Sequence, residues 1–109
     1  MSLNSLSEHC GLNIETLYKI WDVFKQYPAL EKAILYGSRA KGTYRQGSDI
    51  DLTLLGKELD YSQLAKIENQ LDNLLLAYSF DLSLFKEMTD ENLIEHIHRV
   101  GMVFYPVEG

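Results

Sequence analysis

Two aspartates stand two residues apart, directly after a glycine-rich basic segment, in the run GSRAKGTYRQGSDIDL at residues 37–52. From Asp49 to Leu55 the side chains alternate as in a strand, with Asp49 and Asp51 on one face. Because such residues have Cα atoms about 6.5–7 Å apart, the two carboxylates could converge on shared cations. All-oxygen ligands favour Mg²⁺ or Mn²⁺. The spacing therefore predicts a divalent metal site.

A third aspartate lies in a second alternating run, FDLSLF at residues 80–85. The alternation leaves Asp81 and Ser83 on the face opposite the apolar side chains. If the two runs form neighbouring strands about 4.8 Å apart, Asp81 joins the pair. Like charges about 4 Å apart repel by roughly 4 kcal/mol at an effective dielectric of 20, so three carboxylates need a countercharge or bound protons. We therefore expect the three aspartates to form one metal-binding group.

The segment before the aspartate pair has the features of an anion site. Gly37 and Ser38 fall where a strand meets a helical turn, so backbone N–H groups, the serine hydroxyl and the positive helix end can face a phosphate. No acidic residue lies between Glu31 and Asp49, and the loop itself contains three basic residues, Arg39, Lys41 and Arg45. A triphosphate beside two divalent ions is the arrangement for nucleotidyl transfer, because the ions stabilise the attacking and leaving oxygens.

The elements that position these residues follow from the hydrophobic periodicity. The first half predicts a short capped turn at residues 5–8 that Gly11 ends, a helix from an N-cap at Asn13 to a point before Pro28, a strand at 32–36, and a helical turn at 38–41 that Gly42 ends. The second half predicts a strand at 49–55, a helix over 64–75 capped by Asp60 or Ser62, a strand at 80–85, a helix from Thr89 or Asp90 to Gly101, and an edge strand at 102–105.

This alternation of helices and strands predicts an α/β (α+β) fold, with a small mixed sheet of three to five strands covered by helices. We expect a single domain over residues 1–109, because the length and the 46% hydrophobic and 24% charged content are typical of one folded globular unit. The stripe of Tyr18, Trp21 and Phe24 is expected in its core. Cys10, the single cysteine, is expected to be a small packing residue.

Charge and hydropathy exclude several function classes. The net charge of −6 disfavours binding of free nucleic acid, which depends on clustered Lys and Arg. No apolar run is long enough to span a membrane, and the N-terminus has no signal pattern, so we expect a cytoplasmic protein with no membrane partner.

Other interpretations of the same residues are weaker. An isolated Asp-x-Asp on a strand is usually a solvated strand face, and only its combination with the glycine-rich segment and Asp81 favours metal binding. A Walker loop lacks its lysine after Gly42, and the alternation around the Asp pair does not fit an EF-hand. His96 and His98 would point to different sides of a helix, which favours surface or interface roles over a metal pair.

The run GSRAKG followed by GSDIDL resembles the glycine-serine and paired-aspartate signature of the polymerase-beta-like nucleotidyltransferase superfamily, in particular its minimal nucleotidyltransferase (MNT) branch. The signature spans residues 36–52, and its third acidic position fits Asp81. With the order of helices and strands included, the likeness covers nearly the whole chain. It implies the nucleotidyltransferase fold and an enzyme that uses a nucleoside triphosphate, with ATP expected, and two Mg²⁺ (or Mn²⁺) ions, and that releases pyrophosphate.

The resemblance also implies roles for individual residues. Asp49, Asp51 and Asp81 would be the catalytic residues: the first two would be ligands shared by both ions, and the third a further ligand that helps to deprotonate the acceptor hydroxyl. Gly37 and Ser38 would bind the β- and γ-phosphates, with Lys41 as a basic phosphate contact. Arg39 and Arg45 would be either phosphate contacts or solvated loop charges.

Members of the MNT branch work with a separate helical-bundle protein, of the HEPN type or a substrate-binding subunit, and some modify that partner with AMP. The resemblance therefore implies transfer of a nucleoside monophosphate with or onto such a partner, as in the antitoxin of a toxin-antitoxin pair. A homodimer or a heterotetramer with the partner is the expected assembly. The alternative is a catalytically silent binding module that neutralises or scaffolds its partner.

Overall fold

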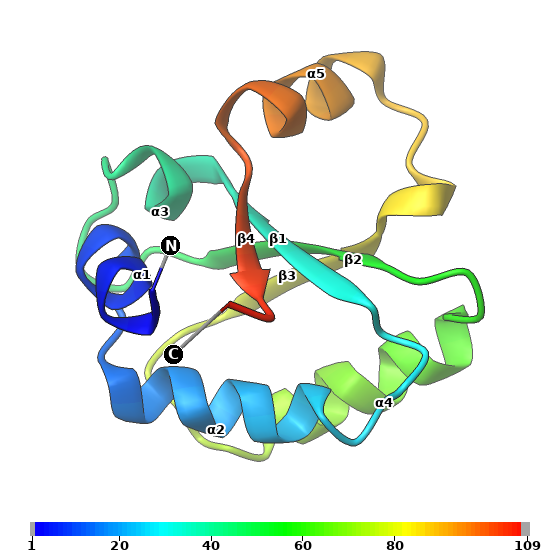
Figure 1. The fold of residues 1–109 in the computed structure, drawn as a ribbon, viewed down its shortest axis with the longest axis horizontal. Helices are drawn as coiled ribbons and strands as arrows, with labels where there is room; N and C mark the ends of the chain where they lie inside the picture. Colours follow the sequence, from blue (N-terminus) through cyan, green and yellow to red (C-terminus); the bar gives the residue numbers. More distant parts are fainter. Residues whose placement is uncertain (1, 108–109) are drawn as a thin grey trace.

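Helices and strands alternate along the chain as the periodicity predicts, and together they form an open four-stranded mixed sheet flanked by helices (Figure 1). This computed structural model describes residues 2–107. The elements in chain order are α1 (Leu3–Cys10), α2 (Ile14–Phe24), β1 (Lys32–Tyr36), α3 (Gly37–Lys41), β2 (Ile50–Leu55), α4 (Tyr61–Asp72), β3 (Phe80–Leu84), the short 3₁₀ turn η1 (Phe85–Glu87), α5 (Glu91–Val100) and β4 (Met102–Tyr105).

The sheet order is β3-β2-β1-β4, so the strands that carry the candidate site residues are neighbours. β1 runs antiparallel to both β2 and β4, whereas β2 and β3 are parallel and α4 makes the crossover between them. Because of these directions, the end of β1 and the starts of β2 and β3 lie at the same end of the sheet. This is the end at which α3 begins, directly after β1.

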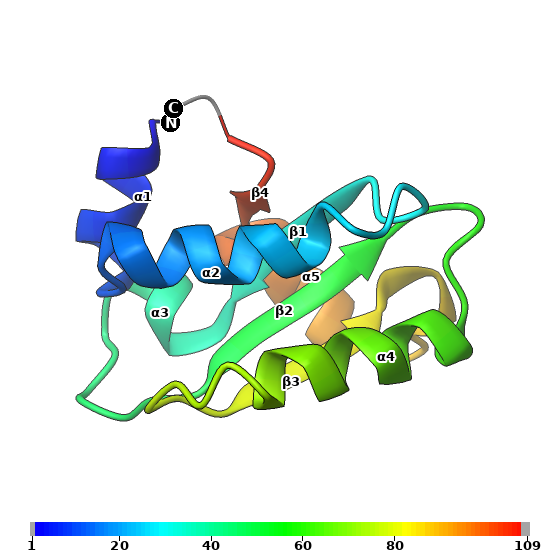
Figure 2. The same cartoon turned by 90° about the horizontal axis from the view of Figure 1, so that it is seen from below.

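The two faces of the sheet are covered to different extents. In Figures 1 and 2, α2 and α4 lie on one face and α5 on the other. The residues of β1 and β2 that point to the α2 and α4 face are fully buried in the core: Ala33, Leu35, Ile50, Leu52 and Leu54. The opposite face carries Asp51 and Thr53, and Thr53 is buried where its hydroxyl oxygen accepts a hydrogen bond from Ser83 Oγ at 3.0 Å. Only one face of the sheet therefore forms a continuous apolar layer.

The helix caps explain where the longer helices begin. The Asn13 side chain accepts a hydrogen bond from the Thr16 backbone N–H at 2.8 Å, as predicted for the N-cap of α2. Between the two predicted caps of α4, the structure selects Asp60, which forms a capping box with Gln63. Asp90 in turn caps α5. The C-terminal ends predicted at Gly11 and Gly42 are confirmed, and both glycines have left-handed backbone angles.

Three predictions about the helices were wrong. The first helix begins earlier than the predicted turn, because Ser2 rather than Ser5 is its N-cap and Leu3 extends its buried stripe. α4 ends at Asp72, so residues 74 and 75 lie beyond it, and Leu75 has a φ of 55° and is 89% exposed. Tyr18 is half exposed, whereas Trp21 and Phe24 are in the core. The first helical pattern was begun too late, whereas the patterns of α2 and α4 included residues that the packing does not bury.

None of the helices within residues 2–107 has the length and apolar character needed to cross a lipid bilayer.

Candidate functional site

Two of the three predicted carboxylates are direct neighbours in the sheet. In the parallel register of β2 and β3, Asp51 pairs with Asp81, and in the antiparallel register of β1 and β2 it pairs with Tyr36. Neighbouring strands lie about 4.8 Å apart, so the Asp51 and Asp81 carboxylates share one face at close range. Asp51 is partly buried and Asp81 is exposed. Asp81 thus points away from the hydrophobic core, as its alternation predicts.

Asp49 lies just outside the strand that was predicted to contain it. β2 begins at Ile50, whose backbone N–H donates to the Ser79 carbonyl at 2.9 Å. On the other side of Asp49, the Ser48 carbonyl accepts hydrogen bonds from the Arg39 side chain instead of from a strand. Asp49 is therefore exposed at the point where the loop from α3 joins the sheet.

The electrostatics of Asp51 reflect the two other carboxylates. Burial, followed by the negative charges of Asp81 and then Asp49, raises the pKa of Asp51 to about 6. Neither of the ion pairs found in residues 2–107, Lys19–Glu15 and Arg99–Glu95, compensates these charges. The site consequently favours a bound proton or a cation.

The donor set suits a hard divalent ion, because three carboxylates supply only oxygen ligands. Across residues 2–107, however, no three His, Cys, Asp or Glu side chains are gathered closely enough to hold a metal ion together. Mutual repulsion of ionised carboxylates gives a physical reason for side chains that stay apart while the backbone brings them to one end of the sheet. The role of Asp49, Asp51 and Asp81 as metal ligands stays a prediction.

Gly37 lies against the carboxylate of Asp51. Its φ is +74°, a conformation that favours glycine, and an added Cβ would lie 2.3 Å from Asp51 Oδ2. The preceding residue, Tyr36, makes no side-chain cap on α3, so the first N–H groups of this short helix have no side-chain acceptor there. The predicted phosphate segment and the predicted metal ligand are therefore in direct contact.

The other predicted phosphate contacts are accessible. Ser38 is half-buried on α3, and Lys41 is exposed in the last turn of the same helix. Arg45 is exposed in the following loop. Nothing in these positions tests their binding to a nucleotide, so their roles stay predictions.

Arg39 is not a solvated loop charge. It is 2% exposed, and its guanidinium donates hydrogen bonds to the backbone carbonyls of Ser48 and Cys10. Sequence reasoning left its role open because a basic residue in a glycine-rich loop is usually at the surface. No local signal in the sequence predicts this burial, because it depends on carbonyls that distant segments supply.

Tyr36 is a site residue that the sequence analysis missed. It is 7% exposed and lies beside Asp51, and burial, followed by the charge of Asp81, raises the pKa of its hydroxyl. The His96 ring packs edge-on against it, with centroids 6.3 Å apart. His98 instead packs against Phe85, which confirms that the two histidines point to different sides of α5. The Tyr36 contact depends on strand register, which one strand alone does not reveal.

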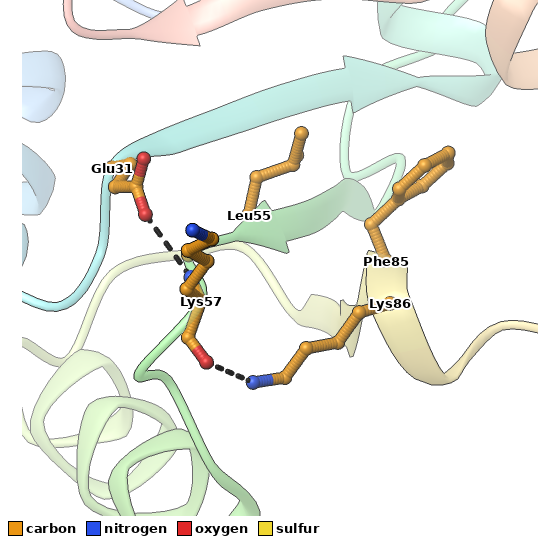
Figure 3. Close-up of a pocket in the computed structure, with 6 residues that line it drawn as sticks. Glu31, Leu55, Lys57, Phe85 and Lys86 are labelled. Carbon is orange, nitrogen blue, oxygen red and sulfur yellow. Dashed lines mark hydrogen bonds between the residues drawn. The ribbon is translucent and has the colours of Figure 1, made fainter.

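The described surface also has grooves away from the carboxylates. One of about 300 Å³ lies at the opposite end of β2, beside Leu55, Lys57 and Phe85 (Figure 3). Figure 3 also shows the Glu31 carboxylate accepting from the Lys57 backbone N–H and the Lys86 ammonium donating to the Lys57 carbonyl. Leu55 is four residues along the strand from Asp51, or roughly 13 Å, so this groove is separate from the candidate site.

Comparison of the fold with solved structures gives several close matches. A chain in a crystal structure of a toxin-antitoxin complex with AMP-PNP superposes with a TM-score of 0.67 at 24% identity, covering 84% of this chain and 73% of that one. A chain in a structure of a tri-AMPylated Shewanella oneidensis HEPN toxin in complex with an MNT antitoxin gives 0.62 at 20% identity, covering 85% and 71%. A chain in the MntA-HepT toxin-antitoxin structure gives 0.63 at 20% identity, covering 87% and 74%. These likenesses establish the nucleotidyltransferase-like fold.

The sequence itself has a family match. No curated protein matches the chain significantly. Residues 18–107, however, match the family described as "Polymerase beta, Nucleotidyltransferase". The matched region contains the glycine-serine segment and all three aspartates. The predicted enzyme class is thereby confirmed: the chain belongs to the polymerase beta nucleotidyltransferase family.

Proposed function

We propose that this protein transfers AMP from ATP to a hydroxyl group of a helical-bundle partner of the HEPN type, and that it acts as the antitoxin of that partner. Family membership supports nucleotidyl transfer. AMP and the partner are suggested by the similar structures, whose names include AMP-PNP and an AMPylated HEPN toxin. The observation that carries the proposal is the pairing of Asp51 with Asp81 directly beside Gly37.

Asp49, Asp51 and Asp81 would hold two Mg²⁺ (or Mn²⁺) ions. When bound, such ions neutralise the triphosphate and stabilise the attacking and leaving oxygens of an in-line displacement. The chain contributes a partly buried carboxylate with a raised pKa, flanked by two exposed ones. A dication would remove the repulsion that raises this pKa.

Gly37 and Ser38 would bind the β- and γ-phosphates of ATP through backbone N–H groups and the Ser38 hydroxyl. The uncapped start of α3 and the positive φ of Gly37 support this role, because they leave donors and space beside Asp51. Lys41 would contribute an ammonium group from the exposed end of the same helix.

Asp81 would accept the proton of the acceptor hydroxyl. The acceptor oxygen attacks the α-phosphorus of ATP, a new oxygen–phosphorus bond forms, and the bond to the pyrophosphate leaving group breaks. Asp81 is exposed on the strand next to Asp51, so a hydroxyl from another molecule can reach it. A cytoplasmic location and assembly with the partner as a heterotetramer, or as a homodimer, belong to the same proposal.

The test is transfer of label from α-labelled ATP to a HEPN-type protein in the presence of Mg²⁺. Asp49→Ala and Asp51→Ala should each reduce transfer by at least about 100-fold, because a lost metal ligand removes electrostatic stabilisation of the transition state. Asp72→Ala, an exposed aspartate at the end of α4, is the matched control and should transfer normally.

Transfer that survives both site substitutions would contradict the assignment. Binding of the partner without any transfer by the wild-type protein would instead support the silent binding module.

A further inference from the structure

We propose that Arg39 is a positioning residue that orients Asp49 for metal binding by holding the peptide group between Ser48 and Asp49. This inference rests on the proposed function, because it takes Asp49 as a metal ligand. It assigns Arg39 no contact with the nucleotide. Its basis is the set of contacts that the buried guanidinium makes with three separate segments of the chain.

The hydrogen bonds of Arg39 go entirely to backbone carbonyls. Its Nε and one terminal nitrogen both donate to the Ser48 carbonyl, at 3.1 and 3.0 Å, and the other terminal nitrogen donates to the Cys10 carbonyl at 2.8 Å. The planar guanidinium suits this pattern, because two donors on one edge share one carbonyl oxygen while a third donor points to another segment. Arg39 thus ties the end of α1 to the last residue of the loop before Asp49.

Two tyrosines complete the environment of this cation. The guanidinium carbon lies 5.1 Å from the centre of the Tyr44 ring and 4.9 Å from the centre of the Tyr78 ring. Such distances are those of cation–π contacts. No ion pair to Arg39 is found among residues 2–107, so carbonyl oxygens and ring faces supply its compensation. A buried arginine without a carboxylate is costly unless this geometry is maintained.

The Ser48 carbonyl matters because it belongs to the same planar unit as the Asp49 backbone nitrogen. Holding this carbonyl from two donors fixes the plane and leaves Asp49 little freedom before its Cα. After Asp49, the Ile50 N–H is held by the Ser79 carbonyl at 2.9 Å. Asp49 itself precedes β2. Arg39 therefore provides on one side of Asp49 the restraint that the sheet provides on the other.

The Tyr78 contact extends this restraint toward the third carboxylate. Tyr78 lies two residues before β3, in the segment that leads to Asp81. The Arg39 side chain thus contacts both the loop that presents Asp49 and the segment that precedes Asp81. Because β2 and β3 are neighbours in the sheet, the two segments that Arg39 contacts lead into adjacent strands.

Arg39→Lys separates this positioning from charge, because lysine keeps the positive charge but has no planar fork. Mn²⁺ is the probe, and its affinity for the purified chain is measured by titration calorimetry or by electron paramagnetic resonance. We expect Arg39→Lys to weaken Mn²⁺ binding about tenfold, the usual size of an effect on a residue that orients a metal ligand. Arg99→Lys, at an exposed position on α5, should bind Mn²⁺ as the wild type does.

A double-mutant cycle distinguishes positioning from a general structural effect. If Arg39 acts through Asp49, Arg39→Lys should cause no further loss of Mn²⁺ affinity in the Asp49→Ala background. An equal loss in both backgrounds would overturn the inference, as would wild-type affinity in the single Arg39→Lys variant. If the wild-type protein binds Mn²⁺ no more tightly than Asp49→Ala does, the proposed metal site itself is overturned, and with it this inference. The comparison of these two proteins therefore tests the proposed function separately.

If Arg39→Lys fails to fold, Tyr78→Leu provides the second variant. Leucine keeps an apolar side chain at this half-buried position but removes the ring face against the guanidinium. We expect a smaller loss of Mn²⁺ affinity than for Arg39→Lys, again absent in the Asp49→Ala background. Unchanged Mn²⁺ affinity in Tyr78→Leu would contradict the inference.

Discussion

At the scale of single residues, several features of Asp51 favour binding of a cation or a proton and disfavour an ionised carboxylate without either. It is partly buried, pairs directly with Asp81 and lies against the backbone of Gly37. Burial raises its pKa, and the neighbouring carboxylates raise it further, to about 6. A side chain held in this way destabilises the metal-free protein when it is ionised, as is common at functional sites.

This raised pKa predicts a specific dependence of stability on pH. The stabilisation from protonated Asp51 is fully present below its unfolded pKa of 3.8 and is lost as the pH rises through about 6. The side chain of Asp51→Asn stays neutral at every pH. Without metal, its free energy of unfolding should therefore equal that of the wild type near pH 4 and exceed it by about 1 kcal/mol at pH 7, a value reduced because Asp51 is partly exposed. Urea unfolding in the presence of a chelator measures this difference. A difference that does not grow with pH would contradict the prediction.

Gly37→Ala should damage the site in a way that backbone strain alone does not. The added Cβ would meet Asp51 Oδ2, and the φ of +74° costs a non-glycine residue about 1–2 kcal/mol. Gly47→Ala is the matched control, because Gly47 has a φ of +82° and open space around its Cβ position. Both variants should lose similar stability, but only Gly37→Ala should lose Mn²⁺ binding. Equal Mn²⁺ affinities in the two variants would show that the contact with Asp51 is unimportant.

At the scale of elements, the sequence predicts which face of a strand each side chain lies on better than it predicts which strands pair with each other. The alternation in β2 and β3 places Asp51 and Asp81 on polar faces, which the register confirms. The glycine after α3 and the capping residues of α2 and α4 were also predictable, because each acts through local hydrogen bonds. Local rules of this kind need no knowledge of the sheet order.

The remaining features of the site depend on contacts between distant segments. Tyr36 faces Asp51 only because β1 and β2 pair in one antiparallel register. Arg39 is buried only because α1, the 43–48 loop and Tyr78 enclose it. Its hydrogen bonds to Ser48 also explain why Asp49 lies before β2, although the alternation alone included it in the strand. These are tertiary effects that no local pattern encodes.

The capping box of α4 gives a prediction for an element that does not touch the site. The Asp60 side chain accepts from the Gln63 N–H at 2.8 Å, so Asp60→Ala should lower the free energy of unfolding by about 1 kcal/mol. Asp72→Ala, at the other end of the same helix, should leave stability unchanged or slightly higher, because an acidic residue is unfavourable near a helix C-terminus. Chemical denaturation of both variants measures this. A similar loss in the two would argue against the cap.

At the scale of the whole molecule, the two faces of the sheet carry different kinds of side chain. The face under α2 and α4 holds the continuous core, whereas the other face is covered by α5 and carries the carboxylates at one end. Since the core does not depend on the polar face, the protein can retain uncompensated negative charge there. A bound cation that neutralises this charge should therefore stabilise the folded protein.

Mg²⁺ with a non-hydrolysable ATP analogue should raise the melting temperature of the wild-type protein. Ligand at 100 times its Kd stabilises the folded state by about 2.7 kcal/mol, or roughly 10 °C for a domain of this size. Asp51→Asn should show little of this increase, although its metal-free form is the more stable one at pH 7. An equal increase in both proteins would indicate binding away from the carboxylates.

The most direct test of the central claim is anomalous diffraction from crystals of the protein grown with Mn²⁺ and a non-hydrolysable ATP analogue. The account predicts a manganese peak about 2.1 Å from carboxylate oxygens of Asp51 and at least one of Asp49 and Asp81, with the analogue's phosphates at Gly37 and Ser38. Manganese bound elsewhere, or phosphates remote from Gly37 with the three aspartates still apart, would contradict it.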